Sequence, residues 1–124
     1  MIHLDTHVLV LLYAGNVERL GAAGRTLIES EDLTVSPAVI LELQLLHEIK
    51  RLKVAPSKLM EDLAANIGVR VSELRFKTVV EHAMSETWVR DPFDRLIVAN
   101  AKAENAVLVT KDEKIRQHVS MAVW

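Results

Sequence analysis

The chain has no cysteine among its 124 residues, which excludes disulfide scaffolds, zinc ribbons and thiol catalysis together. It also lacks an excess of basic residues: 15 lysines and arginines stand against 17 acidic residues, so no broad cationic surface indicates a nucleic-acid-binding protein. A nuclease remains compatible with this charge, because bound cations offset an acidic site. No glycine-rich phosphate-binding loop, internal repeat or low-complexity tract occurs.

Long hydrophobic runs are missing as well. Residues 8–14, VLVLLYA, form an apolar stretch that is too short to span a bilayer. No basic segment precedes it and no small-residue cleavage site is obvious, so the sequence does not predict a signal peptide. We therefore expect a cytoplasmic protein that does not bind membranes. Its length favours one domain over residues 1–124.

What the sequence does contain is an alternation of short β-branched segments with amphipathic ones. Strands are predicted at 1–5, 33–36, 69–72, 107–110 and 121–124. Helices are predicted at 6–15, 20–30, 37–52, 56–68, 76–85, 91–106 and 111–119. Short buried strands between helices are typical of a parallel sheet covered on both faces. We predict an α/β fold, a three-layer α/β/α sandwich with a short, mainly parallel central sheet.

Aspartates recur where these elements meet. Asp5 follows the first strand, Asp112 follows the strand at 107–110, and Asp94 lies near the start of a helix. In parallel α/β sheets, ligands bind beyond the carboxyl ends of the strands. Each aspartate also has a local explanation as a helix cap, worth about 1 kcal/mol. Asp91, which precedes a proline, fits that explanation best, and we assign it the cap.

Glu42 is harder to explain locally, because it lies within the apolar segment AVILELQLL. A buried carboxylate costs several kcal/mol unless it is paired, protonated or bound to a cation. Gln44 lies roughly 200° from Glu42 around a helix, so it does not extend a polar stripe. Taken together, Asp5, Glu42, Asp94 and Asp112 would repel one another unless divalent cations such as Mg²⁺ or Mn²⁺ bind. Such a site favours phosphodiester hydrolysis.

The segments that carry these acids resemble the PIN domain family, and more closely the VapC-like ribonuclease toxins of type II toxin–antitoxin pairs. The matching segments are LDTH at 4–7, VSPAVILEL at 35–43, RDPFDRLIVANA at 90–101 and LVTKD at 108–112. The resemblance implies that the four carboxylates hold one or two Mg²⁺ or Mn²⁺ ions, which activate water against an RNA phosphodiester. It also implies a homodimer and a cognate antitoxin protein that occludes the site.

Further residues are expected around this site. Thr6 is expected to orient Asp5, because metal ligands generally need such support. Thr110 resembles a polar residue that lines the family's pocket, and His7 is expected to form hydrogen bonds near it. Basic residues near the acids are expected to contact phosphates, and Trp88 is a candidate for base stacking. The basic residues are Arg95, Lys111 and Lys114. Apart from Trp88, the residues expected around the site are therefore Thr6, His7, Asp91, Arg95, Thr110, Lys111 and Lys114.

Other interpretations were weighed against this one. A local metal site of His3, Asp5 and His7 requires the strand to continue through His7, whereas the pattern ends it near Asp5. Haloacid-dehalogenase-like phosphatases need an Asp-x-Asp pair, which is absent, and receiver domains need an early acidic pair that is also absent. Within the PIN fold, the alternatives are a nuclease of RNA processing or turnover and a catalytically silent binding protein.

Overall fold

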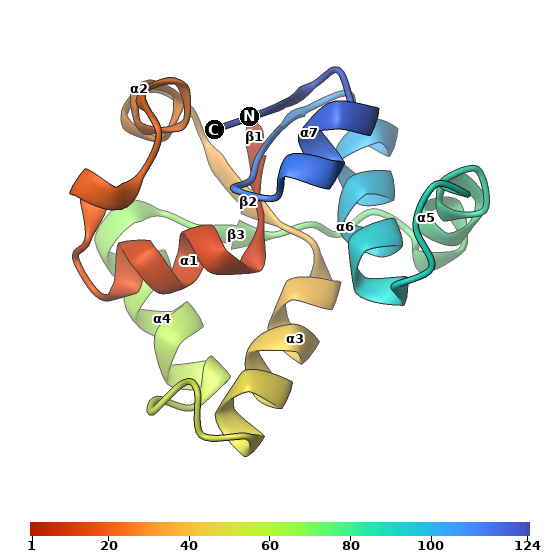
Figure 1. Cartoon of the computed structure of the whole chain (residues 1–124). Helices are drawn as coiled ribbons and strands as arrows, with labels where there is room; N and C mark the ends of the chain where they lie inside the picture. Colours follow the sequence, from red (N-terminus) through yellow and green to blue (C-terminus); the bar gives the residue numbers. More distant parts are fainter.

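A five-stranded sheet forms the centre of the protein in a computed structural model that describes all residues 1–124 (Figure 1). The strands are all parallel, in the order β3-β2-β1-β4-β5, with Ile2 of β1 paired to Leu33 on one side and Val107 on the other. Their bounds are β1 Ile2–Leu4, β2 Leu33–Val35, β3 Arg70–Val71, β4 Val107–Val109 and β5 Ala122–Val123. The predicted α/β class is confirmed.

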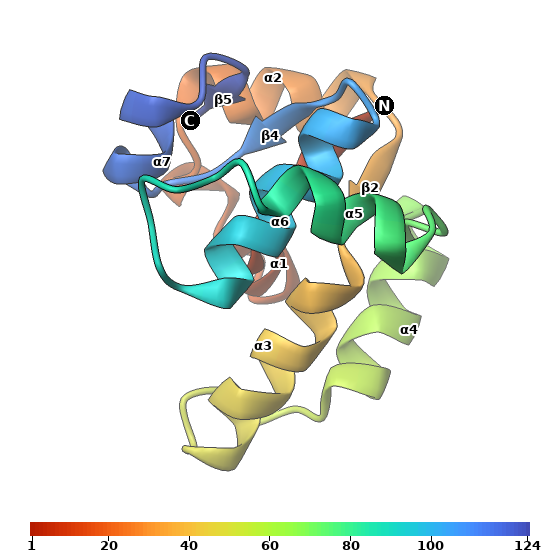
Figure 2. The same cartoon turned by 90° about the vertical axis from the view of Figure 1, so that its right-hand side faces the viewer.

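Helices cover both faces of this sheet. They are α1 Thr6–Tyr13, α2 Ala22–Ser30, α3 Pro37–Glu48, α4 Pro56–Ile67, α5 Phe76–Ala83, α6 Pro92–Ala103 and α7 Glu113–His118, with a 3₁₀ turn, η1, at Val17–Arg19. In both views α1 and α2 lie on one side of the sheet and α5 and α6 on the other (Figures 1 and 2). Helices α3 and α4 extend past the carboxyl ends of the strands. None of the helices combines the length and apolar character that crossing a membrane requires.

The central strands are mostly apolar because both of their faces are covered. Leu4, Val35 and Leu108 are fully buried, and they belong to one core of 20 buried residues that also takes in the inner faces of the helices. A strand buried on both sides can be apolar throughout, as β4 is, whereas β1 and β2 each bury one polar residue, His3 and Thr34.

Helix α3 ends earlier than the sequence predicted. The expected helix 37–52 stops at Glu48, and Lys50 has a left-handed backbone conformation with φ of 63°. The imidazole Nδ1 of His47 and the carbonyl oxygen of Leu52 lie 2.8 Å apart, which holds the chain as it turns away. The basic residues at 50, 51 and 53 therefore lie in the connection to α4 and not in the helix.

Two glycines weaken α2 as an isolated helix, but they allow the chain to close. A Cβ atom at Gly21 would lie 2.4 Å from the carbonyl carbon of Trp124, and one at Gly24 would lie 2.7 Å from Cγ1 of Val109. Only a residue without a side chain permits α2 to approach the end of the sheet this closely. Trp124 packs against the core, as expected for the closing strand.

Candidate active site

The candidate site lies where the strand order reverses. From the central strand β1 the chain continues to β2 on one side, and it later returns to β4 on the other side. Asp5 follows β1 and Asp112 comes shortly after β4, so parallel pairing places both acids at the same edge of the sheet. This edge is where open α/β sheets form their ligand-binding crevices.

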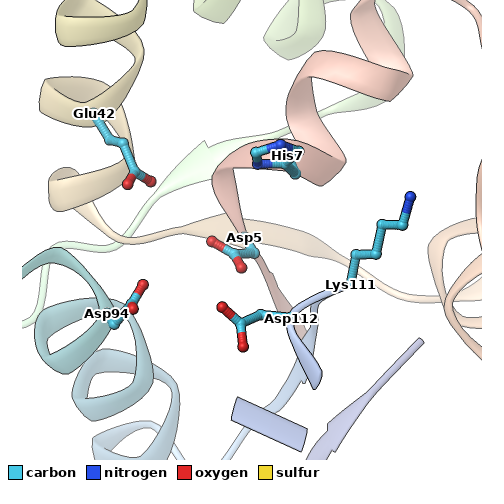
Figure 3. Close-up of a pocket in the computed structure, with 6 residues that line it drawn as sticks. All are labelled: Asp5, His7, Glu42, Asp94, Lys111 and Asp112. Carbon is cyan, nitrogen blue, oxygen red and sulfur yellow. The ribbon is translucent and has the colours of Figure 1, made fainter. Parts of the chain in front are cut away.

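A polar cavity of about 320 Å³ opens at this edge, and no apolar residue lines it. Glu42 reaches it from α3 and Asp94 from the first turn of α6, so four elements contribute the four predicted carboxylates (Figure 3). His7 and Lys111 complete the lining. The ammonium group of Lys111 is directed away from the carboxylates (Figure 3).

Asp5 is held by a hydrogen bond to each of its carboxylate oxygens. The backbone N–H of Thr6 donates to Oδ1 at 2.8 Å, and the hydroxyl of Thr110 donates to Oδ2 at 2.6 Å. Burial raises the pKa of Asp5 above its ordinary value, although these two bonds act in the opposite direction. Thr110 is fully buried and does not line the cavity, so its hydroxyl holds the Asp5 carboxylate from the protein interior.

Thr6 contacts a second carboxylate with its side chain. The sequence predicted that Thr6 orients Asp5, but only its backbone N–H does so, because the hydroxyl donates to Oε1 of Glu42. Thr6 is buried, which fixes this hydroxyl between β1 and α3. Burial raises the pKa of Glu42, while the bond from Thr6 lowers it. Thr6 thus connects the two carboxylates, and its spacing of 36 residues from Glu42 gave no sign of this.

Asp94 has a strongly raised pKa. Its pKa is raised from 3.8 to about 7, first by burial and then by neighbouring negative charges. A carboxyl group with this pKa is only partly ionised near neutral pH, because the cavity gathers acids that lack a compensating cation. The charges that act on it, in decreasing order of effect, are those of Asp91, Asp5, Asp112 and Glu42.

Besides Asp5, which caps α1 by accepting the N–H of Thr6, two of the acids cap helices. Oδ1 of Asp112 accepts the N–H of Ile115 at 3.0 Å at the start of α7, and Oδ1 of Asp91 accepts the N–H groups of Phe93 and Asp94 at the start of α6. Asp91 does not line the cavity, which agrees with its assignment as a cap. Because Asp112 does line it, capping and cavity contact are compatible in the same side chain.

The predicted basic residues separate into two groups. Lys111 lines the cavity, whereas Arg95 and Lys114 do not. The expected position of Arg95 needs correction: its Nε donates to the carbonyl of Val89 at 2.7 Å, and its side chain borders an apolar depression beside α5. It follows Asp94 directly on α6, and consecutive helical residues point about 100° apart.

His3 takes part in a different cluster. It is fully buried in β1, where its Nε2 lies 3.1 Å from Oε1 of Glu104. The same carboxylate oxygen also accepts hydrogen bonds from Ser72 and Asn100. Burial lowers the pKa of His3, and the charge of Glu104 opposes this change. His3 therefore does not line the acidic cavity, and the local site of His3, Asp5 and His7 is excluded.

The donor chemistry of the cavity suits a hard divalent cation. Mg²⁺ and Mn²⁺ prefer carboxylate oxygens, and four carboxylates surround the space while none of them forms an ion pair. The raised pKa of Asp94 is the electrostatic sign of that uncompensated charge. As the side chains stand, no three of them are arranged to hold one ion together. The fit therefore rests on donor type and charge.

A model of the PIN domain family matches residues 2–119, and the chain belongs to that family. It is similar to ribonuclease VapC22 of Mycobacterium tuberculosis (strain H37Rv), with 33% identity over 119 residues, which cover 93% of this chain and 89% of that protein. The resemblance to the PIN domain family that the sequence motifs carried is thereby confirmed.

Solved structures share the fold. VapBC2 from Rickettsia felis, bound to a DNA fragment from its promoter, matches with a TM-score of 0.63 and 21% identity over 94% of this chain and 92% of that one. A toxin–antitoxin complex from Klebsiella pneumoniae matches with a TM-score of 0.71 and 16% identity over 100% and 97% of the two chains. At these identities the likeness establishes the fold, which is that of PIN domains.

Proposed function

We propose that this protein is a Mg²⁺- or Mn²⁺-dependent endoribonuclease that hydrolyses RNA phosphodiesters at the acidic cavity. The observation that carries the proposal is the convergence of four carboxylates without a cationic partner. Burial, together with neighbouring negative charges, raises the pKa of Asp94 to about 7. Such an arrangement opposes folding and is relieved when divalent cations bind. The similarity to a ribonuclease over nearly the whole chain supports RNA as the substrate.

The proposed roles follow from the contacts of each side chain. Asp5, Glu42, Asp94 and Asp112 would hold the cations, which when bound lower the pKa of water and stabilise in-line displacement at phosphorus. Thr110 and Thr6 restrain Asp5, and Thr6 also restrains Glu42. These restraints fix the donor oxygens before substrate arrives, which reduces the reorganisation needed during reaction.

The two positively chargeable residues of the cavity have a separate role. His7 and Lys111 are exposed at its margin and are placed to contact substrate phosphates. In the close-up both lie across the cavity from Glu42 and Asp94 (Figure 3).

We further propose that the protein is the toxin of a toxin–antitoxin pair and acts as a homodimer. The similarity to VapC22 and to structures of toxin–antitoxin complexes supports an antitoxin partner, which would occlude the cavity. Exposed apolar side chains on α3 and α5, and directly after each of these helices, support self-association, because a monomer gains nothing from exposing them. They include Leu41, Leu45, Ile49, Phe76 and Met84.

Cleavage of RNA by the purified protein tests the central proposal. With Mn²⁺ we expect cleavage that EDTA abolishes, and Asp94→Asn should slow it by roughly 100-fold or more, the scale of losing one charge-stabilising group in an active site. Asp62→Asn is the matched control, because Asp62 pairs with Lys58 on α4 outside the cavity. Equal activity of Asp94→Asn and wild type would contradict the assignment.

Expression in a bacterial host tests the biological role. Induction of wild type should arrest growth, whereas Asp94→Asn should not. An active ribonuclease that leaves growth unchanged would instead indicate a nuclease of RNA processing or turnover. A folded protein that binds RNA without cleaving it under any metal condition would indicate a silent binding protein. Sedimentation of the pure protein as a monomer would contradict the proposed homodimer.

A further inference from the structure

A stacked aromatic pair lies beside α7. Trp88, in the loop between α5 and α6, stacks on His118 at the end of α7, with ring centroids 4.8 Å apart and an interplanar angle of 6°. The indole N–H donates to Oε2 of Glu86 at 2.6 Å, and Glu86 is itself buried. The loop is thereby fixed against α7 (Figure 2). His118 is exposed, so its ring presents a flat surface next to Trp88.

Two cations without acidic partners lie near Trp88, one beside its ring and the other, two residues further along the loop. The ammonium of Lys114 lies 6.0 Å from the centroid of the Trp88 ring, and the guanidinium of Arg90 donates to the carbonyl of Thr87 at 2.7 Å. Neither forms an ion pair, whereas Lys102 pairs with the buried Glu86 beneath the loop. Arg90 is thus held in place with its positive charge uncompensated. We name the surface of Trp88, Arg90, Lys114 and His118 the Trp88 surface.

The Trp88 surface lies on and beside α7, the helix that begins at the acidic cavity, although none of its four residues lines the cavity. Lys114 and His118 lie on α7, the helix that Asp112 caps from within the cavity wall. Arg90 precedes Asp91, whose charge contributes to the raised pKa of both Glu42 and Asp94. A chain that enters the cavity can therefore continue across α7 to the loop of Trp88.

We propose that the Trp88 surface binds the single-stranded RNA segment next to the cleaved phosphodiester. Lys114 and Arg90 contact successive phosphates, and an unpaired base stacks on the exposed ring of His118 and extends its stack with Trp88. Flat rings beside unpaired cations are the features that recognise single strands, because every base has a face to stack and every linkage carries a charge. The inference rests on the proposed ribonuclease function and adds that the substrate is unpaired here.

Binding of a fluorescent single-stranded oligoribonucleotide to the Asp94→Asn protein tests this inference without cleavage. Lys114→Gln should weaken binding several-fold and reduce the slope of log affinity against log salt by roughly 0.7, the value for one phosphate contact on a single strand. The matched control is Lys53→Gln, because Lys53 lies in the α3–α4 connection, far from α7 in both views (Figures 1 and 2). This control should bind like its parent.

Stacking is tested by two substitutions at His118. His118→Ala should weaken binding of the single strand by roughly 5-fold or more, the lower end of base–aromatic stacking, while His118→Phe should preserve it. Thermal unfolding of both variants establishes that the loop and α7 remain folded. A duplex of the same sequence should bind more weakly and respond little to His118→Ala, because its bases are already stacked.

The outcomes separate this inference from the function on which it rests. If wild type with Mn²⁺ cleaves RNA while Lys114→Gln and His118→Ala bind like Lys53→Gln, the Trp88 surface is not the RNA path, although the nuclease stands. If His118→Ala weakens duplex and single strand equally, stacking of an unpaired base is wrong. If wild type neither binds nor cleaves RNA, both proposals fail together.

Discussion

Replacing Asp94 with asparagine should stabilise the metal-free protein at alkaline pH. The pKa of Asp94 is raised from 3.8 to about 7 by burial and by the surrounding acids. In the unfolded chain this carboxyl group ionises near pH 4, whereas in the folded protein it retains its proton up to about pH 7. Folding therefore becomes less favourable as pH rises through this window, and the full penalty is present above it.

The size of the effect follows from the position of the side chain. A rise of about three pKa units corresponds to about 4 kcal/mol. Asp94 is half-buried beside an open cavity, so solvent and salt reduce this to about 2 kcal/mol. The charged carboxylate also interacts favourably with the dipole of α6, because Asp94 lies in the first turn, and asparagine loses this interaction, which is worth up to about 1 kcal/mol. The net gain for Asp94→Asn is about 1 kcal/mol, or about 4 °C in Tm for a chain of this length.

Thermal unfolding in EDTA across pH 4 to 8 measures this gain. The advantage of Asp94→Asn should be largest at pH 8 and should shrink toward pH 4. Asp62→Asn is the control of opposite sign, because hydrogen bonds from Lys58 and Tyr13 lower the pKa of Asp62 and favour its charged form. Added Mn²⁺ should raise the Tm of wild type more than that of Asp94→Asn. Equal or lower stability of metal-free Asp94→Asn at pH 8 would refute the electrostatic reasoning.

Three further predictions concern other parts of the molecule. Thr6→Val should weaken Mn²⁺ binding by roughly 10-fold in calorimetric titration, with Thr6→Ser close to wild type, because the hydroxyl that restrains Glu42 is lost only in the first. Glu104→Ala should lower the free energy of unfolding by about 1–3 kcal/mol, because it leaves the buried polar atoms around His3 without an acceptor. Urea unfolding measures this loss, and an unchanged midpoint of the unfolding transition would contradict the prediction. Gly21→Ala should cost about 1–3 kcal/mol, because a Cβ there meets the backbone of Trp124 at 2.4 Å, and unaltered stability would show that the closing strand moves freely.

The sequence was sufficient for features that depend on neighbouring residues. The predicted caps at Asp5, Asp91 and Asp112 are all present, because capping involves a side chain and N–H groups only a few residues away. The prediction that the helix continues through residues 49–52 was wrong, because the end of α3 does not depend on neighbouring residues alone. Its end is set by the contact of His47 with Leu52 and by the turn toward α4, which the apolar periodicity of α3 did not reveal.

Local chemistry also identified which acids required explanation. Glu42 stood out because a carboxylate in an apolar segment is costly wherever the segment packs. Whether it would meet Asp5 depended on strand order and helix placement, which no local pattern encodes. The sequence predicted the contact of Thr6 with Asp5, which its backbone N–H makes, but not the hydrogen bond from its hydroxyl to Glu42, which lies 36 residues away in the sequence.

The sequence by itself determined the alternation of strands and helices, the caps and the set of acids, because period, burial preference and cap chemistry act over a few residues. Tertiary structure alone decided that four elements bring Asp5, Glu42, Asp94 and Asp112 to one cavity and that the pKa of Asp94 rises to about 7. It also decided that Trp88 meets His118 across 30 positions of sequence. Electrostatic repulsion and ring stacking depend on distance through space, and only the packed sheet sets those distances.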